Sequence, residues 1–229
     1  MAYLIDDDVL RFLNGHLGNS DDNAFKRCSD FAYRDMCRTI RFKKEYVESK
    51  DKSAEERQKI TQKKRELRNQ VTELLQDQVE EWIACPPKNF DGDHTALCEQ
   101  IIAVYKNTTD QGQKEDSLYF GQAQKWVNMT LKNLYVYSKS NAPTGICLNN
   151  LLPLLHVPID NVILDVASDK VKCYVDPPST TYGVKKPTKA WSKWDENDYK
   201  TYQKELKARL SGQTPLLWEL THWSTVITE

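Results

Sequence analysis

The regular spacing of apolar residues is the feature that most limits how this chain of 229 residues can fold. Phe25, Cys28, Ala32, Met36 and Ile40 recur at steps of three and four residues, which puts them on one face of an α-helix. The same spacing returns in most of the later segments. The sequence therefore predicts an all-α or nearly all-α fold, built as a compact helical domain.

Two long helices are expected near the N-terminus. The spacing predicts the first over residues 22–48. Ser53 followed by Glu56 is typical of a capping box, which opens a second helix that ends before Pro86. We expect these two helices to form a long antiparallel pair, with the charged first half of the second helix exposed and its apolar second half packed.

Later helices are expected at four places along the chain. Aspartates, which accept hydrogen bonds from the free N–H groups of a first helical turn, mark three of the starts. The four are a helix capped by Asp93, a helix over 121–138, one opened by Asp160 and one opened by Asp195. Residues 171–175 suit a short strand, and the apolar tail 215–227 is expected to dock on the core. One domain over 1–229 is the simplest arrangement, with a sub-boundary near 86–92 as the alternative.

The composition is that of an ordinary intracellular protein. No apolar run approaches the roughly 20 residues of a membrane helix, and the start MAYLIDDDVL lacks the pattern of a signal peptide. The six cysteines are scattered without a C-x-x-C pair, and the four histidines do not cluster with them. We therefore expect a cytoplasmic protein with free thiols, no membrane association, no metal site and no cofactor.

Charge is unevenly distributed, although the formal net charge is only −1. Residues 41–70 hold eleven Lys or Arg and six Asp or Glu. No acidic residue occurs over 117–158 or over 177–194. Such a run is usually a solvated helix face. It also suits a basic surface for nucleic acid, or a protein partner that binds residues 41–84.

Two segments carry the residues best suited to chemistry. In the first, Gly121 and Ala123 are small enough to let backbone N–H groups approach an anion. Lys125 follows in the first helical turn, where its charge opposes the helix dipole. In the second, Asp160 follows Pro158 and precedes an apolar helix. The simplest interpretation is a surface lysine and an N-cap aspartate.

The two segments resemble the hairpin and the following helix of the helix-hairpin-helix DNA glycosylases, such as endonuclease III and the archaeal 8-oxoguanine glycosylases. That family has the pattern G-x-G-x-K, continued as x-A-N. The matching positions are Gly121, Ala123, Lys125, Val127 and Asn128, and Asp160 matches the catalytic aspartate that opens the next helix. The four-cysteine motif of many relatives is missing, so no iron–sulfur cluster is implied.

The resemblance implies a base-excision DNA glycosylase/lyase. Lys125 would be the nucleophile that forms a Schiff base with the sugar of an extruded nucleotide, and Asp160 would assist proton transfer. Double-stranded DNA would be the partner. The residues expected to contact it, from the resemblance and from the basic stretches, are Gly121, Gln122, Ala123, Gln124, Lys132, Lys185, Lys186 and Lys189.

Other interpretations stay open. Trp191 and Trp194, beside the last of these lysines, suit stacking on bases, but they equally suit a role in pinning their segment to the core. The alternative function is a non-catalytic helical module that binds a protein partner through its long charged helices. A third is an enzyme whose site combines His156, His222 and Asp160, without a known motif.

Overall fold

The computed structural model describes Gly15 and residues 23–139, 146–168 and 182–227, apart from the side chains of residues 114 and 223–227. Within these residues every regular element is helical, and β-type pairing is limited to an isolated bridge between Phe42 and Thr109. The prediction of an all-α fold is therefore confirmed. The strand expected at 171–175 lies outside the described residues.

The α-helices, in chain order, are α2 Ala24–Cys37, α3 Ala54–Ala84, α4 Phe90–Val104, α5 Phe120–Lys139, α6 Asn161–Ala167, α7 Glu196–Arg209 and α8 Pro215–Ile227. The short 3-10 helices are η1 Lys44–Tyr46, η2 Lys114–Asp116 and η3 Trp191–Lys193. None of these described helices is both long and apolar enough to cross a membrane.

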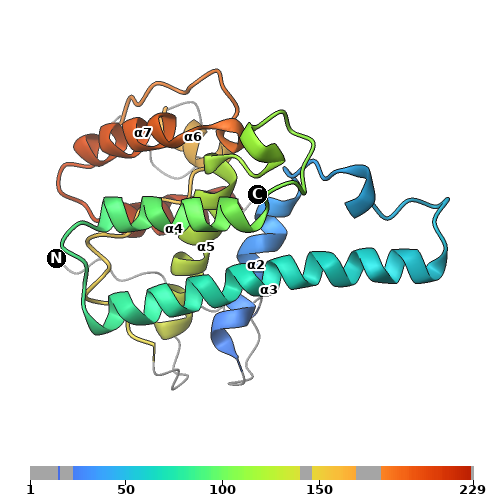
Figure 1. Cartoon of the computed structure of the whole chain (residues 1–229). Helices are drawn as coiled ribbons and strands as arrows, with labels where there is room; N and C mark the ends of the chain where they lie inside the picture. The colour runs from blue at the N-terminus through green and yellow to red at the C-terminus, as the bar shows by residue number, and fades with distance from the viewer. Residues whose placement is uncertain (1–14, 16–22, 140–145, 169–181, 228–229) are drawn as a thin grey trace.

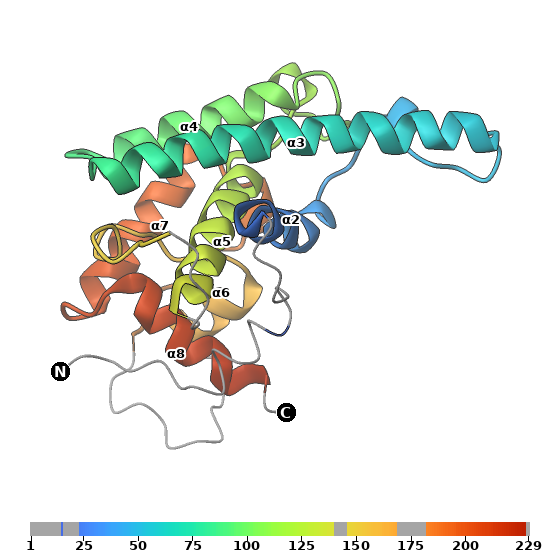
Figure 2. The same cartoon turned by 90° about the horizontal axis from the view of Figure 1, so that it is seen from below.

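Helix α5 lies at the centre of the molecule, and the other helices pack around it (Figure 2). Its side chains from Phe120 to Tyr137 are all buried, because α2, α4, α7 and η3 contact it on different sides. The polar side chains of a helix enclosed in this way are shielded from water, so they must form hydrogen bonds or ion pairs with other groups of the protein. Two of the buried side chains are lysines, Lys125 and Lys132.

The long antiparallel pair consists of α3 and α4, whereas α2 crosses α3 steeply and packs against α5 (Figures 1 and 2). The expected pairing of the first two helices is therefore corrected. The turn between α3 and α4, residues 85–89, falls at the alternative boundary near 86–92. There the rings of Trp82 and Phe90 pack with their centroids 5.0 Å apart.

Helix α2 is shorter than predicted and ends at Cys37 rather than near residue 48. The N–H groups of Thr39 and Ile40 donate to the carbonyls of Met36 and Cys37, at 3.0 Å each, which closes the helix with a tight turn. The chain then extends to the bridge with Thr109. Ile40, which follows the apolar spacing of α2, thus lies outside the helix.

The first half of α3 projects from the body of the molecule (Figures 1 and 2). Its predicted capping box is confirmed, because Ser53 Oγ accepts from the N–H of Glu56 at 3.2 Å and Glu56 Oε2 accepts from the N–H of Ser53 at 2.7 Å. Residues 54–59 are exposed, whereas Val71 and Leu75 are fully buried. The predicted division into an exposed and a packed half is also confirmed.

The other helix starts largely follow their predicted caps. Asp160 Oδ1 accepts from the N–H of Ile163 at 2.9 Å, and Asp195 caps α7. Helix α4 begins earlier than expected, because Asn89 is its cap and Asp93 lies inside its first turn. Helix α8 docks on the core, as predicted for the apolar tail.

Candidate functional site

The two residues that the glycosylase resemblance singles out lie in contact. Lys125 Nζ donates to Asp160 Oδ2 at 2.7 Å and lies 3.5 Å from Asp35 Oδ2. Its side chain is only 2% exposed, against 22% for Asp160 and 31% for Asp35. Burial raises the pKa of Asp160, but the charge and hydrogen bond of Lys125 outweigh burial and leave that pKa below its usual value. The pair joins α5 to the start of α6 and to α2.

A second ion pair lies deeper in the core. Lys132 Nζ donates to Glu219 Oε1 at 2.6 Å, and both side chains are 2% exposed. Burial raises the pKa of Glu219 more strongly than the charge of Lys132 lowers it. Lys132 was expected to contact DNA. In this structure it cannot do so, because it lies within the core between α5 and α8.

Residues Gly121–Gln124 are also enclosed. The N–H of Gly121 donates to the carbonyl of Trp194 at 2.9 Å, and those of Gln122 and Ala123 donate to the carbonyl of Tyr119. Their side chains are buried within the first turn of α5, so in this conformation none of them reaches a phosphate group. Gly121 is needed here for close packing, since a Cβ would lie 1.9 Å from the carbonyl oxygen of Trp191.

The segment with the remaining expected DNA contacts is held by its tryptophans. Trp191 and Trp194 are buried, which confirms the interpretation that they pin this segment to the core. Lys186 forms an ion pair with Asp165, and Lys189 pairs with both Asp195 and Asp198. Lys185 is exposed. Two of the three lysines are therefore already neutralised by carboxylates of the chain.

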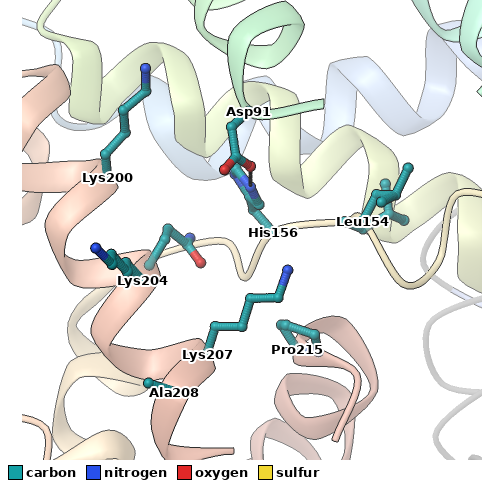
Figure 3. A pocket seen from close by; sticks show the side chains of 10 residues that line it. Asp91, Leu154, His156, Lys200, Lys204, Lys207, Ala208 and Pro215 are labelled. Carbon is teal, nitrogen blue, oxygen red and sulfur yellow. Dashed lines mark hydrogen bonds and ion pairs between the residues drawn. The ribbon is translucent and has the colours of Figure 1, made fainter. Parts of the chain in front are cut away.

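A pocket of about 520 Å³ opens beside α7, on the side that faces the start of α4 and the segment before α6 (Figure 3). This volume is in the range of small-molecule sites. The pocket is lined by both apolar and polar side chains. The lining residues are Asp91, Leu154, Leu155, His156, Lys200, Gln203, Lys204, Lys207, Ala208 and Pro215.

Three lysines give the pocket a positive wall. Lys200, Lys204 and Lys207 are spaced by four and three residues, which puts them on one face of α7. Lys200 pairs with Glu196 at 2.6 Å. Within the described part of the chain, neither Lys204 nor Lys207 has an ion-pair partner, and the side chain of Lys207 extends toward His156 (Figure 3).

A chain of hydrogen bonds runs from the pocket into the core. Asp91 Oδ1 lies 2.8 Å from His156 Nε2, and His156 Nδ1 lies 2.8 Å from the Tyr199 hydroxyl. Tyr199 in turn lies 2.8 Å from Asn128 Nδ2, and Asn128 Oδ1 lies 2.9 Å from His94 Nε2. Asp91 is the exposed end of this chain and His94 is its buried end.

The donor and acceptor of each hydrogen bond in this network can be assigned by starting from the carbonyl of Gly121. Gln124 Nε2 donates to the carbonyl of Gly121, so its Oε1 must accept from Asn128 Nδ2. Asn128 Nδ2 therefore donates to Tyr199 as well, and Asn128 Oδ1 accepts from His94 Nε2–H. The Tyr199 O–H is then free to donate to His156 Nδ1, which leaves His156 Nε2–H to donate to Asp91. This arrangement holds for a neutral imidazole, in which His156 presents its Nε2–H to Asp91.

The ionisation of these groups follows their burial. Burial lowers the pKa of His94 to about 3 and raises the pKa of Tyr199 well above its usual value, so both are neutral near pH 7. The hydrogen bond from His156 lowers the pKa of Asp91, and the charges of His156 and Lys207 act in the same direction. Asp91 is therefore a carboxylate, stabilised by the positive groups of the pocket.

Sequence reasoning found only part of this site. His156 was one residue of the third interpretation, but the structure pairs it with Asp91 rather than with Asp160. The three lysines of α7 were not singled out, although their spacing on an amphipathic helix was a readable signal. Among the described residues, no group of three His, Cys, Asp or Glu side chains is arranged to hold a metal ion.

No family model, no curated protein and no solved structure matches this chain. Its function must therefore be inferred from the chemistry of these residues.

Proposed function

We propose that the protein binds a small anionic molecule in the pocket beside α7. The observation that carries this proposal is the pair Lys204 and Lys207, two ammonium groups without ion-pair partners that line a concave, partly apolar space. An anion bound in the pocket would be attracted by both charges, which the protein leaves without a carboxylate partner. Binding is the proposed role, and no reaction is assigned.

The pocket lining sets the kind of anion. Leu154, Leu155 and Pro215 supply apolar lining that suits a hydrocarbon or ring, while the three lysines and His156 supply polar lining. The ligand class is therefore a carboxylate or phosphate ester with one compact apolar group. Two uncompensated lysines favour a dianion over a monoanion, because each charge adds its own attraction.

Asp91 would compete with such a ligand. Its carboxylate occupies the hydrogen bond of His156 Nε2–H, and its side chain is 74% exposed and able to swing away. An incoming anion can take over that hydrogen bond. Asp91→Asn removes the competing charge, so this substitution is expected to strengthen anion binding several-fold, by an amount of the order of 1 kcal/mol.

The proposal is tested by calorimetric titration at low salt with three ligands that share one ring. Phenyl phosphate carries a double charge, benzoate a single charge, and benzamide none. The affinity should fall in that order. Lys204→Gln combined with Lys207→Gln should weaken phenyl phosphate binding by roughly tenfold or more, about 1.4 kcal/mol per tenfold.

A matched control changes two lysines elsewhere. Lys88 and Lys193 are exposed and lie outside the pocket, so Lys88→Gln with Lys193→Gln should leave the affinity unchanged. Equal binding of benzamide and phenyl phosphate would contradict an anion site. An equal loss in the control variant would show only a general effect of net charge, and would also overturn the proposal.

A second candidate function is the lysine-dependent DNA chemistry that the resemblance implies. What supports it is the 2.7 Å contact between Lys125 Nζ and Asp160 Oδ2, two residues 35 positions apart in the sequence. In such a reaction the amine attacks the sugar C1′, and the base leaves with the bonding electrons. Because the lysine is enclosed, the surrounding segments would have to open to admit a nucleotide.

Borohydride trapping on DNA with an abasic site tests this candidate. A covalent adduct is expected if Lys125 forms a Schiff base. Lys125→Arg keeps a positive partner for Asp160 but forms no stable Schiff base, so it should abolish the adduct while circular dichroism shows an intact fold. Absence of an adduct with the unchanged protein would rule the candidate out, and would not affect the pocket proposal.

A further inference from the structure

We propose that the basic half of α3, residues 57–68, is a docking surface for duplex DNA. This segment holds six Lys or Arg and a single Glu within twelve residues. It belongs to the half of the helix that projects from the body (Figures 1 and 2). The surface is separate from the pocket, which lies beside α7.

The charges of this segment are only partly neutralised by the chain. Lys59 pairs with Glu55, Lys64 with Glu48 and Arg68 with Asp30. The remaining three, Arg57, Lys63 and Arg65, are exposed and have no ion-pair partner within the described part of the molecule. A basic cluster that the protein leaves unpaired on a projecting element is complementary to a polyanion.

The shape of the segment selects duplex DNA among polyanions. An isolated helix is about 10–12 Å wide with its side chains, and the major groove of B-DNA is about 12 Å wide. The twelve residues span about 18 Å, which corresponds to roughly five base pairs. The 3-10 helix η1 and the residues that follow it lie along one side of this segment, but no α-helix of the body lies beside its outer part in either view (Figures 1 and 2). A groove can therefore receive it without a change of fold.

The rest of α3 limits the contact to this half. Glu73, Asp77, Glu80 and Glu81 are exposed on the second half of the helix, where they repel phosphates. The contact is thus short and dominated by the phosphate backbone, which predicts weak affinity without sequence preference.

The test is fluorescence anisotropy with a labelled duplex of about 20 base pairs, at salt concentrations from about 25 to 200 mM. Contacts by three to four basic residues predict a slope of about −2.7 to −3.6 for log K against log salt. The triple substitution Arg57→Gln, Lys63→Gln and Arg65→Gln should make this slope shallower by about 2.7. These side chains are exposed, so the fold should be retained.

The control variant is Lys88→Gln, Lys185→Gln and Lys193→Gln, which removes the same charge from other exposed positions. It should leave the slope unchanged, and it includes a lysine that the sequence alone placed at a DNA surface. Loss of binding in the control rather than in the α3 variant would overturn the proposal. So would the absence of binding at the lowest salt, or equal competition by poly-glutamate, which would indicate an acidic protein partner.

Discussion

At the scale of single residues, His94 shows how the core controls ionisation. The imidazole is 1% exposed and donates through Nε2 to Asn128, while its Nδ1 faces the thiol of Cys98 at 3.8 Å. Burial is the main reason that its pKa falls from 6.5 to about 3. A protonated ring would be a buried charge without a carboxylate in contact, so folding and protonation at this position oppose each other.

The free energy of unfolding should therefore fall in acid partly because of His94. Between pH 6.5 and about 3 the unfolded chain binds a proton here and the folded chain does not. Above pH 6.5 His94 is neutral in both states and does not alter stability. Below pH 6.5 the lowered pKa reduces the free energy of unfolding by up to about 1.4 kcal/mol per pH unit. His94→Gln keeps an N–H donor for Asn128 and should reduce this slope. Urea unfolding at several pH values, compared between the two proteins, measures the difference, and identical slopes would contradict it.

Asp160 uses its two oxygens for different tasks, so its roles can be separated. Oδ1 caps α6 through Ile163, and Oδ2 pairs with Lys125. Asp160→Asn retains the capping oxygen and loses the charge, whereas Asp160→Ala loses both. The alanine variant should be less stable than the asparagine variant by about 1 kcal/mol, the usual worth of a cap. Chemical denaturation of both variants gives this difference, and equal stabilities would mean that the cap contributes nothing.

The residues that sequence reasoning placed correctly are those with local partners. The Asp160 cap could be predicted because its partner lies three positions away. His156 and Asp91 are 65 positions apart, and His156 and Tyr199 are 43 apart. No periodicity relates such positions, so their network depends on how the helices pack. Only the family resemblance, and no sequence pattern, indicated that Lys125 and Asp160 belong to one site.

At the scale of elements, Gly121 tests how α5 meets η3. Alanine normally stabilises a helix relative to glycine by about 1 kcal/mol. Here an added Cβ would lie 1.9 Å from the backbone oxygen of Trp191, so the contact must open. Gly121→Ala should therefore lower stability by about 1–3 kcal/mol, as overpacking does. Thermal unfolding decides between the two signs, and a higher melting temperature would contradict the close packing.

Helix starts could be predicted better than helix ends and pairings. The Ser53 and Asp195 caps are read from a few adjacent residues. The early end of α2 depends on the bridge between Phe42 and Thr109, which is a distant contact. The pairing of α3 with α4 instead of α2 likewise depends on tertiary packing, because both α2 and α4 also pack against the buried helix α5. Such long-range packing contacts form only in the assembled core, so no local sequence pattern predicts them.

At the scale of the whole molecule, the projecting half of α3 and the body should differ in stability. The body encloses α5 and holds the buried Trp82, Trp126, Trp194 and Trp218. In the projecting half, residues 54–66 are exposed apart from Ile60 and the partly buried Lys64. An isolated helix of this length is marginal in water, and its capping box and side-chain pairs add only fractions of a kcal/mol to about 1 kcal/mol.

Hydrogen exchange should therefore change along a single helix. Amides of residues 57–66 are expected to exchange by local opening, much faster than those of residues 71–82, which open only when the body unfolds. Mass spectrometry of peptides from the two halves measures this gradient. If duplex DNA docks on residues 57–68, its addition should slow exchange in the first half and leave the second half unchanged. Equal protection of both halves in the free protein would mean that the projecting half is held by contacts beyond those described, and it would remove the open surface that DNA docking requires.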